Sequence, residues 1–329
     1  MDQGARFPAV KRRRGHYESF YIKACRPGGG RGIWIRHTVH KRPGAEPKGS
    51  IWFTFFDAEA EGPHATKITV GPEQLSVPAG EWIRVQDAEI GPGHASGSVS
   101  TDALSASWEL TFSGTAGPCA YLPAEWLYKA RLPKTKFVAP HPDVTFEGTL
   151  TLDGEAISLD GWPGMIGHNW GTEHAERWVW LEGTGFGDHE DTYFDAGAAR
   201  IQVGRWTSPW IPSGMLRLNG TEHRLGGPKY ARKAQITERP TSCEFELPGD
   251  GVIVRGRVSA PQKDFVGWVY ADPAGPEHNT VNCSISDLEL EILREGRPAD
   301  KLELKGGAAY EFGMRETDHG IPIQPYPDG

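Results

Sequence analysis

The sequence predicts an all-β protein built from antiparallel strands. Three observations support this class: apolar and polar residues alternate in many short segments, two-residue turns join such segments, and the 329 residues include 42 Gly and 26 Pro. Successive side chains of a strand point to opposite faces of a sheet, and abundant glycine and proline favour turns over long helices. The chain shows neither an amphipathic helix of ordinary length nor an alternation of strands with helices, so antiparallel meanders are the simplest connection.

Two hairpins are predicted from their turn residues. The segment TLTLDGEAISL (149–159) alternates around Asp-Gly, and MLRLNGTEHRL (215–225) alternates around Asn-Gly. These dipeptides suit the type I′ turn, which needs positive φ at both central residues. FELPGDGVIVRGRVSA (245–260) predicts two strands joined by a longer turn. LPAEWLYKARL (122–132) is a candidate for a short helix, and an irregular crossover fits it equally well.

Strands in this number must close into barrels or stack as sandwiches to hide their edges. We expect a basic leader over residues 1–15, an N-terminal β domain over 16–160 and a C-terminal β domain over 161–329. Residues 1–50 hold twelve Lys or Arg against three Asp or Glu, although the formal net charge of the chain is −8. The leader is expected to be solvated and partly disordered. Transient contact with an anionic membrane surface is the alternative, and the oligomeric state stays open.

Several classes of function are disfavoured. The acidic body argues against nucleic acid as the main partner. The four cysteines lie far apart without a CxxC pair, so a zinc ribbon or a thioredoxin-like motif is not expected. GTGFG (183–187) lacks the spacing of a dinucleotide fingerprint, and the chain has neither a Walker motif nor a G-x-S-x-G elbow. No apolar run is long enough to span a bilayer, so the sequence predicts a cytoplasmic protein. Without a cofactor motif, no cofactor is expected. The expected ligand is an apolar small molecule.

The stretch GMIGHNWGTEHAERWVW (164–180) concentrates two His, two Glu and three Trp in seventeen positions. If its strands are extended, alternate residues share a face. Each strand then presents aromatic and titratable groups together, as a barrel interior or the mouth of a hydrophobic pocket needs. The expected groups that share a face are His168, Trp170 and His174; Glu176, Trp178, Trp180 and Glu182; and, in TYFDAGAARIQV (192–203), Tyr193 and Asp195.

This mixture of residues suits acid–base chemistry on an apolar molecule. A carboxyl group against tryptophans has a raised pKa and can donate a proton, and a neighbouring histidine can orient it or take a proton back. Two simpler interpretations remain. His168 and Trp170 can be packed core residues. His168, His174 and His189 can be metal ligands, but their spacing matches no zinc pattern, so no metal is expected.

The blocks GMIGHNWG, RWVWLEG and DTYFDAGAARI resemble a known signature. It is that of the two-domain lipocalin-like superfamily of hydroxyneurosporene synthase (carotenoid 1,2-hydratase), tocopherol cyclase, AttH-like proteins and cofactor-free Diels–Alderases. The stretches 18–40 and 281–292 agree, and the resemblance covers most of residues 16–315. It implies two lipocalin-like antiparallel β-barrels, or half-barrels, packed together with a hydrophobic site within or between them.

The resemblance also implies a function. It is that of a cofactor-independent hydratase, cyclase or isomerase acting on a terpenoid- or polyketide-like substrate. The matched positions suggest that His168 relays a proton, Trp170 faces a cationic intermediate, Tyr193 hydrogen-bonds the substrate or the acid, and Asp195 donates the proton. The expected substrate-binding residues are His174, Glu176, Trp178 and Trp180.

One position departs from the pattern of the superfamily. Many members carry an acidic residue directly before the His of the HNWG block, where this chain has Gly167. Asp195 or Glu176 would then have to supply the proton. A lipid-binding carrier or sensor is the alternative function, because the same fold binds ligands without chemistry. A carbohydrate-binding β module is a third class, and it would require exposed tryptophans.

Overall fold

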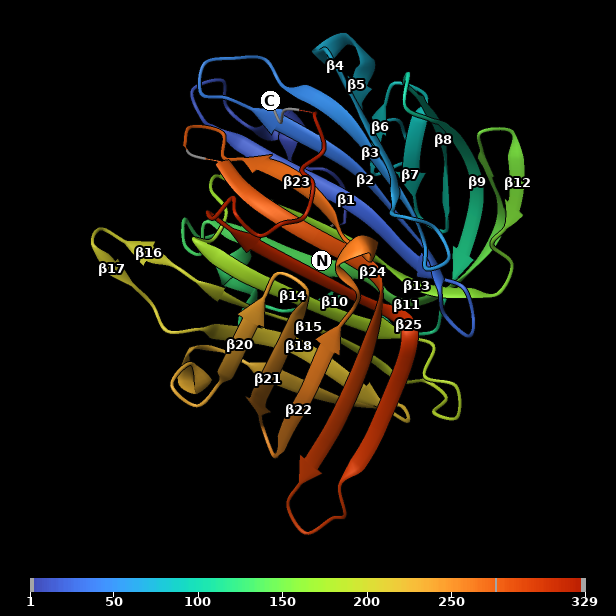
Figure 1. Ribbon diagram of the computed structural model, residues 1–329. Helices are drawn as coiled ribbons and strands as arrows, with labels where there is room; N and C mark the ends of the chain where they lie inside the picture. Colours follow the sequence, from blue (N-terminus) through green and yellow to red (C-terminus); the bar gives the residue numbers. More distant parts are fainter. Residues whose placement is uncertain (1–2, 276, 327–329) are drawn as a thin grey trace.

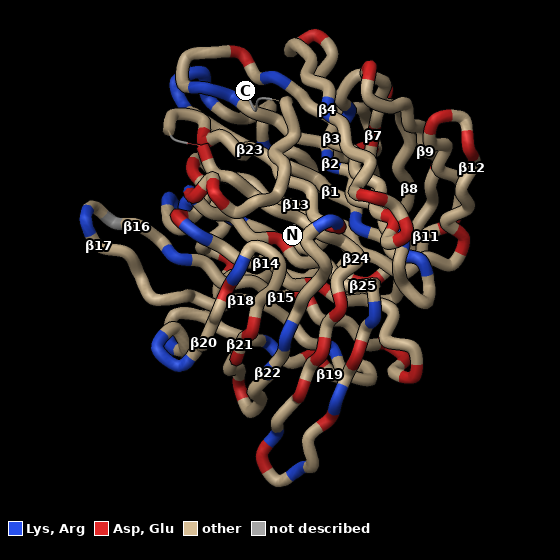
Figure 2. Tube along the Cα trace, in the orientation of Figure 1, with Lys and Arg blue, Asp and Glu red and all other residues tan. Residues whose placement is uncertain are grey.

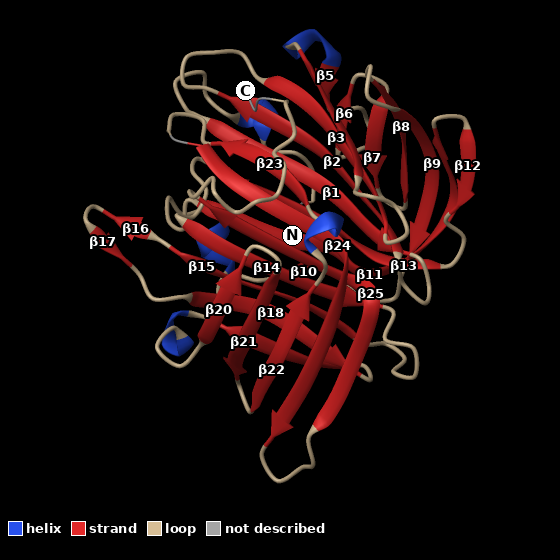
Figure 3. Cartoon of the chain, in the orientation of Figure 1, coloured by secondary structure: helices blue, strands red, loops and turns tan. Residues whose placement is uncertain are grey.

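The computed structural model describes residues 3–275 and 277–326, and their regular structure is almost entirely strand (Figure 3). Within these residues the strands form two large antiparallel sheets, which lie against each other (Figure 1). The first sheet has the order β4-β3-β2-β1-β13-β11-β9-β8-β7-β6-β5, with β10 and β12 paired to β11. Its strands are β1 His16–Cys25, β2 Arg31–Lys41, β3 Lys48–Asp57, β4 His64–Val70, β5 Leu75–Ser76, β6 Ile83–Val85, β7 Ala88–Gly91, β8 His94–Ser100, β9 Ser105–Ser113, β10 Cys119–Ala120, β11 Thr135–Leu152, β12 Glu155–Ser158 and β13 Trp162–Gly171.

The second sheet has the order β19-β18-β15-β14-β25-β24-β22-β21-β20, with β23 paired to β24. A pairing of β19 with β21 closes it into a barrel, so the all-β prediction of two packed antiparallel barrel-like units is confirmed. Its strands are β14 Arg177–Thr184, β15 Tyr193–Arg200, β18 Ile211–Leu218, β19 Thr221–Gly226, β20 Gln235–Arg239, β21 Ser242–Gly249, β22 Val252–Ser259, β23 Val266–Ala271, β24 Glu277–Arg294 and β25 Asp300–Met314.

The remaining elements are small. Strands β16 (Gln202–Val203) and β17 (Trp206–Thr207) pair only with each other. Among the described residues, no helix is long and apolar enough to cross a membrane. The helices are short 3₁₀ turns: η1 Phe7–Ala9, η2 Pro72–Gln74, η3 Glu125–Tyr128, η4 Pro228–Tyr230 and η5 Gln262–Asp264.

Both predicted hairpins are confirmed, and their turns have the expected backbone. Asp153 and Gly154 join β11 to β12 with φ of 48° and 88°, and Asn219 and Gly220 join β18 to β19 with φ of 48° and 80°. The turn between β21 and β22 has only two residues, so the longer turn expected there was wrong. In the segment 122–132 only η3 is helical, and the rest is an irregular crossover.

Strand β13 shows where one sheet passes into the other. It pairs with β1 on one side and β11 on the other, so residues 162–171 belong to the first sheet. The sheets therefore change between Gly171 and Arg177, after the domain boundary expected at 160/161. The alternating pattern of a strand specifies its two faces but not its partners, which is why the sequence did not place this strand. The division into two domains itself stays a prediction.

The basic leader folds back onto the first sheet. The backbone N–H groups of Arg6 and Phe7 donate to the carboxylate of Glu18 at 2.7 Å and 2.8 Å. Lys41 Nζ donates to backbone carbonyl groups of the leader at 2.9–3.3 Å, those of Lys11, Arg12 and Arg14. These contacts give residues 3–15 a defined path, where a partly disordered arm was expected.

The two faces of β1 position the candidate site. Phe20 and Ile22 enter the core of the first sheet. Tyr21 and Lys23 alternate with them and point toward the second sheet, where Lys23 Nζ lies 2.7 Å from Oε2 of Glu182 on β14. Both members of this ion pair are fully buried. The junction between the sheets is therefore a packed interface with charged groups inside it.

The outer surface differs from this junction. Figure 2 shows acidic and basic residues interspersed along β22, β24 and β25 of the second sheet. Some of them pair across or along strands, as Arg255 with Glu246 at 2.6 Å and Lys305 with Glu303 at 2.7 Å. Exposed pairs of this kind contribute little to stability, so the buried groups of the junction are the more informative ones for function.

Candidate active site

Strand β14 presents its aromatic face to the first sheet. Val179 and Leu181 enter the core of the second barrel, so Trp178 and Trp180 point the opposite way, as the alternating pattern predicted. Trp180 packs edge-on against Tyr21 of β1, with ring centroids 5.5 Å apart. The predicted face of β14 therefore lies outside the barrel, at the junction between the sheets.

Strand β15 repeats this arrangement beside β14. Phe194 and Ala196 belong to the barrel core, whereas Tyr193 lies in a small cluster of buried residues at the junction. Asp195 is on the same face as Tyr193, and it pairs in register with Glu182 of β14. The predicted common face of Tyr193 and Asp195 is confirmed.

Asp195 is buried and hydrogen-bonded on both oxygens. The hydroxyl of Tyr121 donates to Oδ2, and the indole Nε1 of Trp180 donates to Oδ1 at 2.9 Å. Burial raises the pKa of Asp195 to about 7, although these two hydrogen bonds oppose the rise. A general acid works best when its pKa lies near the working pH, so this carboxyl group is suited to give and take a proton.

The surroundings of Asp195 are mainly apolar and aromatic, with phenol groups among them, and the buried Lys23–Glu182 ion pair lies on the neighbouring strands. Tyr121 stacks on Phe137 of β11 with ring centroids 4.8 Å apart. Among the described residues, the hydroxyl of Tyr193 is buried without a hydrogen-bond partner. Such a group is ready to bind a polar atom of a ligand. The buried cluster consists of Ala116, Cys119, Tyr121, Ala139, Met165, Tyr193 and Met215, with Tyr21, Phe137 and Trp180 packed against it.

His168 and Trp170 lie on the other face of the first sheet. The ring of His168 stacks on Phe20 at 3.8 Å and lies 4.6 Å from the ring of Trp170. Its Nε2 is 2.8 Å from Oε1 of Glu18. Phe20 belongs to the core of the first sheet, away from the junction that holds Asp195. The structure thus brings His168 together with Trp170, and Tyr193 together with Asp195, but it separates the two pairs.

Glu18 is the anionic partner of His168. Burial alone would raise the pKa of Glu18, but hydrogen bonds from His16 and His168 lower it to about 2. Burial lowers the pKa of His168. A neutral imidazole beside a carboxylate donates from the nitrogen that faces it, so we place the proton of His168 on Nε2. Among the described residues the Nδ1 of His168 is buried without a partner, so His168 is a packed core residue with one of its two ring nitrogens satisfied.

The lack of space beside Tyr21 explains why position 167 is a glycine. Tyr21 lies directly across from it in the pairing of β1 with β13. A Cβ added at Gly167 would lie 2.0 Å from Cζ of Tyr21, well inside van der Waals contact. The phenol ring of Tyr21 therefore occupies the space that a side chain at position 167 would need, and it lies against Trp180.

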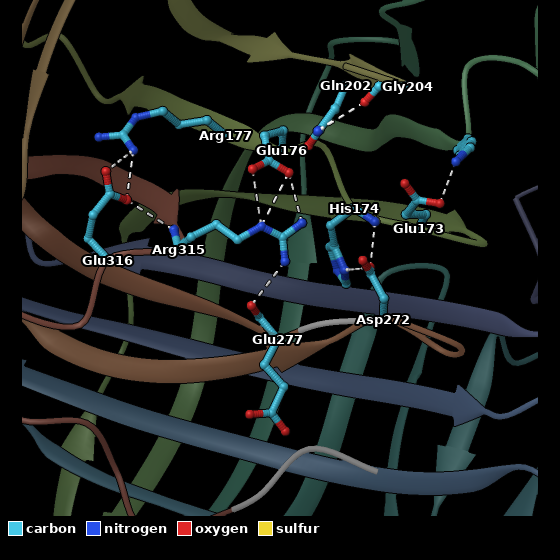
Figure 4. A network of polar contacts seen from close by, with 11 residues as sticks. Glu173, His174, Glu176, Arg177, Gln202, Gly204, Asp272, Glu277, Arg315 and Glu316 are labelled. Atoms are coloured by element: carbon cyan, nitrogen blue, oxygen red, sulfur yellow. Dashed lines mark hydrogen bonds and ion pairs between the residues drawn. The ribbon is translucent and has the colours of Figure 1, made fainter. Parts of the chain in front are cut away.

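The four predicted substrate-binding residues divide into separate groups. Trp180 belongs to the surroundings of Asp195. Glu176 is held by Arg315, whose Nη2 lies 2.8 Å from Oε2 (Figure 4). His174 does not share a strand face with His168, because β13 ends at Gly171. The expectation of one continuous strand to His174 was wrong.

His174 lies instead with Trp178 near one end of the junction. Its Nδ1 is 2.7 Å from Oδ1 of Asp272, as Figure 4 shows. Tyr17 stacks on its ring with centroids 4.0 Å apart. A pocket of about 10 Å³ opens here, with room for about one water molecule. Its lining residues are Tyr17, Glu18, Arg36, Thr38, Val39, His40, Trp52, His174 and Tyr270.

Sequence reasoning missed the partners that come from distant strands. Tyr121 is 74 residues from Asp195, and Asp272 is 98 residues from His174. Nothing in a single sequence pairs such positions. Tyr21 and Lys23 could have been found, because ESFYIKAC alternates apolar and polar residues and places both on one face of a predicted strand.

Comparison with known proteins supports the fold. No protein-family model matches the chain. Two uncharacterized proteins from strains of Mycobacterium tuberculosis are each 25% identical over 323 residues, which cover 96% of this chain and 93% of theirs. An AttH-like protein from Nitrosomonas europaea has a TM-score of 0.53 at 12% identity, with 94% of each chain covered. CghA, solved with Sch210972, has a TM-score of 0.54 at 10% identity, with 92% of this chain and 89% of that chain covered. The chain therefore has the two-unit, all-β fold of the AttH-like proteins, as the resemblance implied.

Proposed function

We propose that the protein is a cofactor-independent enzyme, a hydratase, cyclase or isomerase, that acts on an apolar terpenoid- or polyketide-like molecule at the junction between the sheets. The observation that carries this proposal is the buried carboxyl group of Asp195. It lies among aromatic side chains, accepts hydrogen bonds from Tyr121 and Trp180, and has a pKa raised by burial to about 7. A group of this kind transfers protons in apolar surroundings.

The proposed reaction begins with proton transfer from Asp195. The proton adds to one carbon of a substrate double bond, and the aromatic faces of Trp180 and Tyr21 stabilise the positive charge at the other carbon. In a hydratase a water molecule bonds to that carbon, and its extra proton returns to the carboxylate. In a cyclase or isomerase the substrate itself supplies the electrons or the proton. We assign to Tyr193, whose buried hydroxyl has no partner among the described residues, a hydrogen bond to the substrate.

His168 and Trp170 have a different part in this proposal. Their rings lie on the core face of β13, against Phe20 and Glu18. We infer that they position β13 and, through it, the wall formed by Tyr21 and Gly167. Their direct action on a substrate, as the resemblance suggests, would require a ligand inside the first sheet.

The test begins with the purified full chain. Organic extraction and mass spectrometry identify any bound compound, which is then incubated with the stripped protein. We expect conversion of the compound, loss of conversion in Asp195→Asn with binding nearly intact, and unchanged conversion in Asp188→Asn, which alters an exposed acid of a nearby loop. Unchanged turnover in Asp195→Asn would contradict the role proposed for Asp195.

A carrier or sensor for a lipid is the second candidate. It is favoured by Gly167, which offers no acid and has Tyr21 in the space that a side chain would need. In this case the extracted compound returns unchanged, and Asp195→Asn alters neither its fate nor its affinity much. The third class, a carbohydrate-binding module, requires exposed tryptophans. Trp126 and Trp206 are 67% and 59% exposed, whereas Trp170 of the HNWG block is only 8% exposed.

A further inference from the structure

Three potential metal ligands meet at the end of the junction where His174 lies. His174 comes from the segment between β13 and β14, Asp272 directly follows β23, and His278 is the second residue of β24. One ligand atom from each residue lies within 4.8 Å of the other two. This span is little more than twice the Zn–N distance of about 2.1 Å, so small side-chain movements would let all three bind one ion.

The hydrogen bonds of these residues leave several polar atoms unsatisfied. His278 is fully buried, and neither of its ring nitrogens has a partner among the described residues. In the same part of the chain, His174 Nε2 and Asp272 Oδ2 are buried without partners. An imidazole always has a hydrogen-bonding atom at each nitrogen, and buried polar groups are normally paired. The unsatisfied atoms thus point to a bound group that supplies what the protein does not.

The surroundings hold the rings in place. Tyr17 stacks on His174 at 4.0 Å, and Trp178 lies 5.6 Å from His174 and 5.2 Å from His278. The indole of Trp178 is itself fixed by a hydrogen bond to Glu311 at 2.9 Å. Outer contacts of this kind orient the ligands of a metal and tune its affinity.

The neighbouring charges are compatible with a cation. Two positive groups lie nearby in the described part of the chain. The guanidinium of Arg315 is bound by the carboxylate of Glu176 and by the backbone carbonyl of Glu277 (Figure 4). Arg36 lines the adjoining pocket, where it lies over the ring of Tyr270 and donates from Nε to the hydroxyl of Ser19 at 2.8 Å. The carboxylate of Asp272 remains as the negative group directly at the cluster. His174 also lines the pocket of about 10 Å³ described above, so a ligand in that pocket would reach the cluster.

We propose that His174, Asp272 and His278 form a binding site for a divalent transition metal ion of the zinc class, with a further coordination position toward the pocket. Imidazole nitrogen with carboxylate oxygen is a donor set that zinc accepts, and three protein ligands with one open position are typical of sites that bind a small oxygen-containing ligand. The site is separate from Asp195 and does not depend on the acid–base proposal. It also differs from the set His168, His174 and His189 that was considered from the sequence and disfavoured by its spacing, because two of its members come from a distant hairpin.

Zinc binding by the full chain tests this proposal. The purified protein is treated with a chelator, titrated with Zn²⁺ alone, and separated from free metal before the bound zinc is counted. We expect one zinc ion per chain in the wild type, and at least a tenfold loss of affinity in His278→Gln and in Asp272→Asn. His189→Gln, which alters a histidine in the loop between β14 and β15, is the matched control and should bind as the wild type does.

Two further measurements guard against misfolded variants. Circular dichroism shows whether each variant keeps its strand content. If His278→Gln does not fold, thermal unfolding of the wild type in Zn²⁺ and in chelator decides, because an ion that binds only the folded state raises the midpoint. No bound zinc, full affinity in folded His278→Gln and Asp272→Asn, or an unchanged wild-type midpoint would overturn the proposal.

Discussion

Two buried carboxyl groups, one in the first sheet and one at the junction, have opposite properties. Glu18 is 1% exposed and Asp195 is 4% exposed. The pKa of Glu18 is lowered to about 2, whereas the pKa of Asp195 is raised to about 7. At neutral pH the first is ionised, and the second exists in both protonation states. Equal burial therefore does not decide the charge of an acid.

The hydrogen-bond donors around each group explain the difference. Glu18 accepts from the backbone N–H groups of Arg6 and Phe7 and from two histidine rings. Asp195 accepts only from the hydroxyl of Tyr121 and the indole of Trp180. Each donor favours the charged form, and burial disfavours it. Glu18 is thus fitted to anchor the leader and β13, and Asp195 is fitted to exchange a proton.

The largest expected effect is on the pH dependence of stability through Asp195. Its pKa in the folded protein lies above the unfolded value, so its contribution to stability is complete below about pH 4 and is lost as pH rises through 7. Three pKa units correspond to about 4 kcal/mol. Urea unfolding at pH 4 and pH 8 should show Asp195→Asn gaining up to this amount relative to the wild type at pH 8, and little at pH 4. A constant difference in the free energy of unfolding at both pH values would show that folding does not raise the pKa of Asp195.

Glu18 should give a slightly smaller effect of opposite sign. Its pKa in the folded protein is below the unfolded value, so its contribution is present above about pH 4.5 and is lost as pH falls through 2. Glu18→Gln should therefore lower the free energy of unfolding at pH 7 by about 3 kcal/mol, because the amide cannot accept from all the donors. The difference should shrink at pH 3. Glu109→Gln, at an exposed position of β9, should change stability by less than about 0.5 kcal/mol.

A third test concerns the contact between Gly167 of β13 and Tyr21 of β1. Gly167→Ala places a Cβ 2.0 Å from the ring of Tyr21, and overpacking of this kind lowers stability by about 1–3 kcal/mol. Gly117→Ala is the matched control, since a Cβ there meets nothing within 4 Å. Equal urea midpoints for the two variants would show that Tyr21 moves aside freely.

The smallest effect is expected at Glu176, the acid at the rim of the junction. Its ion pair with Arg315 is partly exposed, with side chains 26% and 34% accessible. Pairs in such positions contribute about 0–1 kcal/mol, so Glu176→Gln should lower the free energy of unfolding by less than about 1 kcal/mol. Salt should reduce the difference further. A loss as large as that of Glu18→Gln would show that exposure is not what separates these acids.

Local patterns in the sequence predicted the strands and their faces. The Asp153-Gly154 and Asn219-Gly220 turns were predictable because their backbone needs residues that tolerate positive φ. The common face of Trp178 and Trp180 followed from the two-residue period of a strand. These features depend on neighbours in the chain, so one sequence is enough to predict them.

The composition of the site was not predictable in the same way. The hydroxyl of Tyr121 reaches Asp195 across 74 residues, and Glu18 meets His168 across 150. The period of a strand says which residues share a face, but not which strand lies opposite. The sequence therefore predicted Asp195 as an acid among aromatic residues, while the separation of His168 from it required the order of the strands.

The position of β13 has a bearing on how the chain is synthesised. This strand fills the space between β1 and β11, yet it leaves the ribosome after both. Until residue 171 has emerged, a nascent chain carries two unpaired strand edges in the middle of its first sheet, and such edges pair readily with other chains. A protein cut at residue 160 would keep these edges permanently. During the interval of translation between β11 and β13, both of these edges are thus open to pairing with other chains.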